Sequence, residues 1–84
     1  MKLTWRRHPD YGHPHRRGNQ VVGGGTFEAT LLIVAEQPGP ISMIMVAART
    51  EKRLLRTARH MLTVWERRHN RSDGEALLTV LPVR

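Results

Sequence analysis

The 84-residue sequence contains no cysteine, so neither disulfides nor thiolate metal ligands can reinforce its fold. Its longest uninterrupted apolar run, residues 43–48, is far too short to span a bilayer. The first residues lack the apolar stretch of a secretory signal, and we therefore expect a soluble, cytoplasmic protein. A chain of this length predicts one small domain, residues 1–84, which buries only about 60 to 65% of its unfolded surface. A large enclosed active site is not expected.

Acidic residues are also scarce. Fourteen Lys and Arg against seven Asp and Glu give a net charge of +7 and an isoelectric point near 11.5. The electrostatic field of such a positively charged protein attracts phosphate backbones, anionic membranes and acidic protein surfaces alike. Arginine far outnumbers lysine, which favours planar, bidentate contacts with phosphate or carboxylate groups.

Apolar and polar residues alternate over residues 2–7, which predicts a short half-buried strand. Residues 8–25 are rich in Gly, Pro and His without sustained periodicity, and predict a long mobile loop. Residues 26–36 and 41–49 are apolar and β-branched, and predict a hairpin. Pro38 and Gly39 between them fit the central positions of a type II turn.

A helix is predicted from Thr50, its N-cap, to His69, and a last strand over residues 75–83. The resulting β-β-β-α-β order indicates an α+β fold, in which an antiparallel sheet packs on one long amphipathic helix.

The predicted helix has two contrasting faces at about 100° per residue. Its apolar stripe consists of Leu54, Ala58, Met61, Leu62 and Trp65, with Leu55 at the edge. On the opposite side lies a set of bases that we call the basic ridge, which consists of Lys52, Arg53, Arg56, Arg59, His60 and Arg67. Like charges at i, i+3 and i+4 positions repel by a few tenths of a kcal/mol each, which favours an anionic counterpart.

We therefore expect the Lys and Arg of the ridge to bind nucleic acid backbone or an acidic surface of a nucleic-acid-handling complex. Further contacts are expected from Arg6, Arg7, Arg16 and Arg17. No helix-turn-helix, zinc-finger or RNP1-like pattern accompanies the ridge, which disfavours reading of base sequence. The alternative is a self-associating structural protein whose basic helix face is only a solvated surface.

The second and third predicted strands are apolar on both faces, whereas one helix covers only one face. Four residues are predicted to need another cover, namely Leu32, Val34, Ile44 and Val46. A second copy of the chain is the favoured cover, which predicts a homodimer. The alternative is that the loop folds over them with Tyr11, Val21 and Val22.

The sequence offers few candidate catalytic residues. The loop carries four potential metal ligands, His8, Asp10, His13 and His15, but their spacing matches no metal motif, and an ordinary polar loop is expected. The Gly-rich stretch before residue 27 lacks the Walker spacing and its Lys. We expect no catalytic residues, no cofactor, no metal and no small-molecule substrate, and hence no enzyme.

The stretches "GGGTFEA" and "TEKRLLRTARHMLTVWERR", with Trp5 in a first strand and a tight hairpin, resemble small α+β proteins of phages and mobile elements. Anti-CRISPR inhibitors are among these proteins. The resemblance implies a binding inhibitor of a host defence system. Many such inhibitors are acidic and imitate DNA, whereas this chain is strongly basic, so the resemblance implies engagement of an acidic surface or of the nucleic acid held by an effector.

Overall fold

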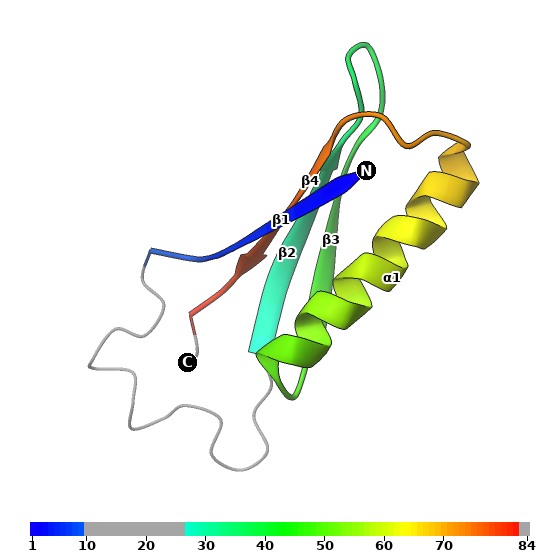
Figure 1. Cartoon of the computed structure of the whole chain (residues 1–84). Helices are drawn as coiled ribbons and strands as arrows, with labels where there is room; N and C mark the ends of the chain where they lie inside the picture. The colour runs from blue at the N-terminus through cyan, green and yellow to red at the C-terminus, as the bar shows by residue number, and fades with distance from the viewer. Residues whose placement is uncertain (10–26, 83–84) are drawn as a thin grey trace.

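The computed structural model describes residues 1–9 and 27–82. The elements of this part of the chain are β1 (Lys2–Arg7), β2 (Phe27–Val34), β3 (Ile41–Ala48), α1 (Glu51–His69) and β4 (Glu75–Val80). The predicted β-β-β-α-β order is confirmed, and the strands form one sheet that α1 covers on one face (Figure 1). The fold is therefore α+β, as predicted.

The strand order across the sheet is β1-β4-β2-β3. β2 pairs antiparallel with both β3 and β4, whereas β1 pairs parallel with β4. The prediction of an antiparallel sheet is thus wrong at β1. The physical reason is that β4, apolar on both faces at Leu77 and Leu78, takes a central place between β1 and β2. β1, which carries three charges, is left at the edge.

The predicted hairpin of β2 and β3 is confirmed, and Ala35 N–H donates to the Pro40 carbonyl at 3.1 Å across its base. The type II turn is wrong. Gly39 does not adopt a positive φ, and the Gln37–Pro38 peptide bond is cis. Gly39 is required for space instead, since a Cβ there would lie 2.5 Å from the Glu36 carbonyl oxygen.

Both ends of α1 follow from local sequence. Thr50 is the N-cap, and its hydroxyl accepts from Arg53 N–H at 3.1 Å. Asn70 adopts the left-handed conformation at the C-terminal end, with φ 51° and ψ 45°. Arg71 N–H then donates to the Glu66 carbonyl at 3.1 Å, which satisfies a carbonyl that the last turn leaves free.

The hydrophobic core lies between α1 and the covered face of the sheet. It consists of Ala29, Leu31, Ile33, Ala35, Val46, Leu54, Ala58, Leu62, Trp65, Ala76, Leu78 and Val80. The predicted apolar stripe of α1 is confirmed, because its remaining members Leu55 and Met61 pack against this core. Trp65 also donates its indole N–H to the Ser42 hydroxyl at 3.0 Å, which ties α1 to β3.

The turn between α1 and β4 is held by an ion pair that also reaches the hairpin. Arg71 Nε and Nη2 donate to the two carboxylate oxygens of Asp73, each at 2.7 Å. Asp73 Oδ2 in turn accepts from Glu36 N–H at 2.9 Å. The hydrogen bond from Arg71 is the main cause that holds the pKa of Asp73 far below its ordinary value.

Candidate functional site

The basic ridge occupies the side of α1 that faces away from the sheet. All six of its side chains are exposed, namely Lys52, Arg53, Arg56, Arg59, His60 and Arg67. Among residues 1–9 and 27–82, no carboxylate forms an ion pair with any of them. Their charge is therefore available to solvent and to an external anion.

The two acidic residues of α1 are both directed toward β1. Glu51 accepts two hydrogen bonds from Arg7, from Nε at 3.0 Å and from Nη2 at 3.1 Å. Glu66 accepts from the amino group of Met1 at 2.8 Å. Because both carboxylates pair with positive groups on that flank, neither forms an ion pair with the ridge.

Of the four additional bases predicted to join the ridge, the structure describes Arg6 and Arg7, and these two lie on opposite faces of β1. Arg7 lies at the start of α1, but its guanidinium pairs with Glu51 and sits 5.5 Å from the centre of the Trp5 ring. Arg6 projects from the other face of β1, where its Nε donates to the Thr79 hydroxyl at 3.4 Å. Successive side chains of a strand point to opposite faces, so β1 cannot present both to one partner. Arg16 and Arg17 lie outside the described residues.

The open face is the face of the sheet that α1 does not cover. The register pairs Leu32 with Met43 and Val34 with Ile41 across β2 and β3. Leu32 and Val34 therefore lie on the open face, as predicted. Val46 is buried beneath α1, and Ile44 packs against the same core.

The proposed grouping of Ile44 and Val46 with Leu32 and Val34 is therefore corrected. A change of one residue in strand register exchanges the two faces of a strand. The register, set by the pairing of Ala35 with Pro40, places the odd-numbered residues of β3 on the open face.

Three side chains of β3 dominate the exposed apolar surface. Ile41, Met43 and Met45 are 61%, 65% and 58% exposed, and all three lie on the open face. The sequence predicts that both faces of this strand are apolar, but it does not indicate which face α1 covers. The register of the hairpin was the missing signal.

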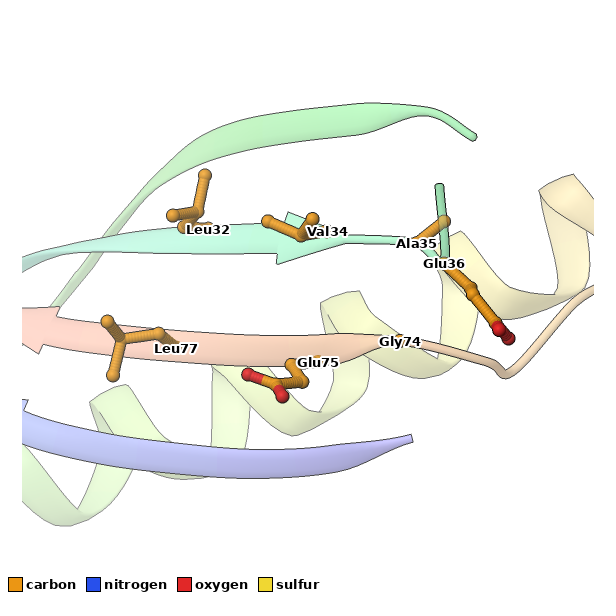
Figure 2. A pocket seen from close by; sticks show the side chains of 7 residues that line it. All are labelled: Leu32, Val34, Ala35, Glu36, Gly74, Glu75 and Leu77. Carbon is orange, nitrogen blue, oxygen red and sulfur yellow. The ribbon is translucent and has the colours of Figure 1, made fainter. Parts of the chain in front are cut away.

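The open face has a hollow between β2 and β4, near the turn that joins β2 to β3. The hollow has a volume of about 550 Å³, and its floor is formed by Leu32, Val34 and Leu77, which project away from α1 (Figure 2). Glu36 and Glu75 stand at its end, beside Gly74. This end of the open face is thus apolar with an acidic margin, in contrast to the basic ridge.

Of the four potential metal ligands His8, Asp10, His13 and His15, for which an ordinary polar loop was expected, only His8 lies within the described residues. Within residues 1–9 and 27–82, no group of three or more His, Asp and Glu side chains is placed to hold a metal ion. In the same part of the chain, no helix is both long and apolar enough to cross a bilayer.

The fold and these surfaces define a small basic α+β protein with one cationic helix face and one sheet face that no other element of residues 1–9 and 27–82 covers. No protein-family model matches the chain, and comparisons with curated proteins and with solved structures find no significant similarity.

Proposed function

We propose that the protein is a small, non-enzymatic binding protein that engages the phosphate backbone of nucleic acid through its basic ridge. The observation that supports this most is the separation of charge on α1. Both acids of the helix are occupied at β1, whereas the ridge has no carboxylate partner among the described residues. A face arranged in this way favours an external polyanion over internal compensation.

The ridge is long enough to contact several phosphates of a nucleic acid backbone. The 19 residues of α1 give a rod about 28 Å long at 1.5 Å per residue. Five Lys and Arg along it predict a fall of log K against log salt with a slope of about −4 to −5 on duplex DNA. Recognition through phosphates is independent of base sequence, so we expect similar affinity for unrelated duplexes.

The test is fluorescence anisotropy with labelled duplexes over a series of salt concentrations. Arg56→Glu changes the ridge, and Arg6→Glu is its matched control, because it makes the same charge change on the opposite face of the sheet. We expect Arg56→Glu to weaken binding far more than Arg6→Glu. Equal loss in both variants would show that only net charge matters, and affinity that does not depend on salt would exclude the proposal.

The resemblance to anti-CRISPR inhibitors extends the proposal to a biological setting. The ridge would then engage nucleic acid held by a host defence effector, or an acidic surface of that complex. Purified protein should inhibit target cleavage by a guide-loaded effector. The variant Arg53→Glu/Arg56→Glu/Arg67→Glu should not inhibit it, and we expect this variant to stay folded because all three side chains are exposed. Inhibition that the triple variant retains would rule out the ridge as the inhibitory surface.

Self-association is the second candidate function, and a different observation favours it. The open face exposes Ile41, Met43 and Met45, and large apolar side chains gathered in this way mark an interaction surface. A homodimer is the partner that we propose for this surface. If the protein is purely structural, reversing the charges of the ridge changes little in its behaviour.

A further inference from the structure

The two edges of the sheet differ in how they are protected. β1, at one edge, carries Lys2, Arg6 and Arg7 among its six residues. β3, at the other edge, reads ISMIMVAA and has neither charge nor proline over eight residues. Charges and prolines are the usual means by which proteins prevent an exposed edge from pairing with another strand. Only the β3 edge lacks them.

The free backbone groups of β3 belong to the same residues that expose apolar side chains. In an antiparallel pair, alternate residues direct their N–H and C=O groups toward the neighbouring strand. The bond from Ala35 N–H to the Pro40 carbonyl sets this alternation. Ser42, Ile44 and Val46 therefore bond toward β2. The residues that direct their backbone groups outward are Ile41, Met43, Met45 and Ala47.

The middle of the α1 flank on the same side as this edge is also uncharged. Glu51 and Glu66 mark the flank toward β1 by their contacts. Thr57, Met61 and Val64, spaced by one helical turn each, lie on the opposite flank, above β3. Val64 is 39% exposed. The strand edge and the middle of the helix flank above it (Figure 1) thus form one uncharged surface, which ends at the exposed Arg68, one turn beyond Val64.

We propose that β3 pairs antiparallel with β3 of a second copy of this chain, around a two-fold axis perpendicular to the sheet. The backbone N–H and C=O groups of both edges can form hydrogen bonds only in registers that place outward-directed residues opposite each other. The register that opposes Met43 to Met45 of the other copy does so, and it places apolar side chains together on the joined open face. The proposal rests on the self-association proposed above and specifies its surface.

Charge at the ends of β3 favours a second copy as the occupant. In this register Gly39 opposes Arg49 of the other copy, so that the hairpin loop carrying Glu36 lies beside that arginine. Glu36 and Arg49 are both exposed. At each end an exposed arginine thus meets a loop that carries an exposed carboxylate, and the uncharged centre matches only an equally uncharged strand.

The pairing also arranges the basic ridges. A two-fold axis perpendicular to the sheet leaves both copies of α1 on the same face of an eight-stranded sheet. Two ridges on one surface bind a long polyanion bivalently, which raises affinity without any new contact. A duplex long enough to contact both ridges should therefore bind more tightly than one that spans a single ridge.

The first experiment measures oligomeric state by sedimentation over a range of protein concentrations. Met43→Lys places unpaired charges in the paired edge and should weaken dimerisation by about 100-fold or more. Thr4→Lys is the matched control on the β1 edge and should leave the dimer intact. Circular dichroism should show both variants folded, since Met43 and Thr4 are exposed. A wild-type chain that stays monomeric overturns both self-association and the edge pairing.

The second experiment tests the register, and it benefits from the absence of native cysteine. Directly opposed residues have Cβ atoms about 5 Å apart, whereas diagonal neighbours are about 7 to 8 Å apart. A mixture of Met43→Cys and Met45→Cys chains should therefore oxidise mainly to the disulfide-linked heterodimer. Random cross-linking, preferential homodimers, or a dimer that survives Met43→Lys would refute the edge pairing while leaving self-association in place.

Discussion

Both faces of the β2–β3 pair carry large apolar residues, yet these residues differ sharply in burial. On the face beneath α1, Leu31 and Ile33 are completely buried. On the open face, Met43 and Met45 are more than half exposed. Alternate residues of the same two strands thus have opposite environments. An apolar side chain contributes to the stability of the monomer only where another element covers it.

The largest expected effect tests this contrast directly. Leu31→Ala removes a fully buried side chain and should lower the free energy of unfolding by about 2 to 5 kcal/mol. Met43→Ala on the open face should change it by less than about 1 kcal/mol in the monomer. Denaturant unfolding at low protein concentration measures both. Similar losses in the two variants would show that the open face is covered within the chain.

The margin of the open face provides the next test. Gly74 has φ 100°, and a Cβ at this position would lie 2.1 Å from the Val34 carbonyl oxygen. Gly74→Ala should therefore destabilise the protein by about 1 to 3 kcal/mol. The same unfolding assay applies, with Ser72→Ala in the same turn as control. A neutral effect would mean that β2 and β4 separate at this end at little cost.

A smaller effect is expected where β3 meets α1. Ser42→Ala leaves the indole N–H of buried Trp65 without its partner, which costs about 1 to 2 kcal/mol. The unfolding free energy of Ser42→Ala should therefore fall between those of Leu31→Ala and Met43→Ala. If Ser42→Ala is as stable as the wild type, this hydrogen bond does not hold the edge strand to the helix.

The smallest expected effect is on the pH dependence of stability, and it concerns Asp73 in the turn between α1 and β4. The pKa of Asp73 is lowered in the folded state, chiefly by its hydrogen bond with Arg71. Its carboxylate therefore stabilises the fold fully above its unfolded pKa of about 3.9. This contribution is lost as the pH falls below about 4 toward the folded value.

Thermal melts from pH 6 to pH 2 should show this loss as a small decrease in Tm. Asp73→Asn should have a lower Tm at pH 6 and a shallower dependence on pH. An unchanged pH profile in Asp73→Asn would show that other carboxylates govern acid unfolding.

Much of the fold follows from local patterns. The helix, its Thr50 cap and its apolar stripe were predictable, because capping and helical periodicity depend on residues a few positions apart. The parallel pairing of β1 with β4 was not, since the two strands lie at opposite ends of the sequence. Local alternation marks a strand, but it carries no information about which strand becomes its neighbour.

The candidate surfaces divide in the same way. The basic ridge was predicted because its charges share one side of a single helix. The register of the hairpin decides that Ile44 and Val46 face α1 whereas Met43 and Met45 lie on the open face. The ion pair between Arg7 and Glu51 joins residues that are 44 positions apart in the sequence. The pattern of one segment alone does not determine the strand register or the contacts between residues far apart in the sequence.

The net charge, the element order and the two faces of α1 follow from the sequence alone, because each is a property of composition or of local backbone geometry. The tertiary structure decided that β4 separates β1 from β2, that the acids of α1 are occupied at β1, and that β3 forms an uncharged edge. These features depend on which distant segments meet, and burial of apolar surface selects that arrangement for the chain as a whole.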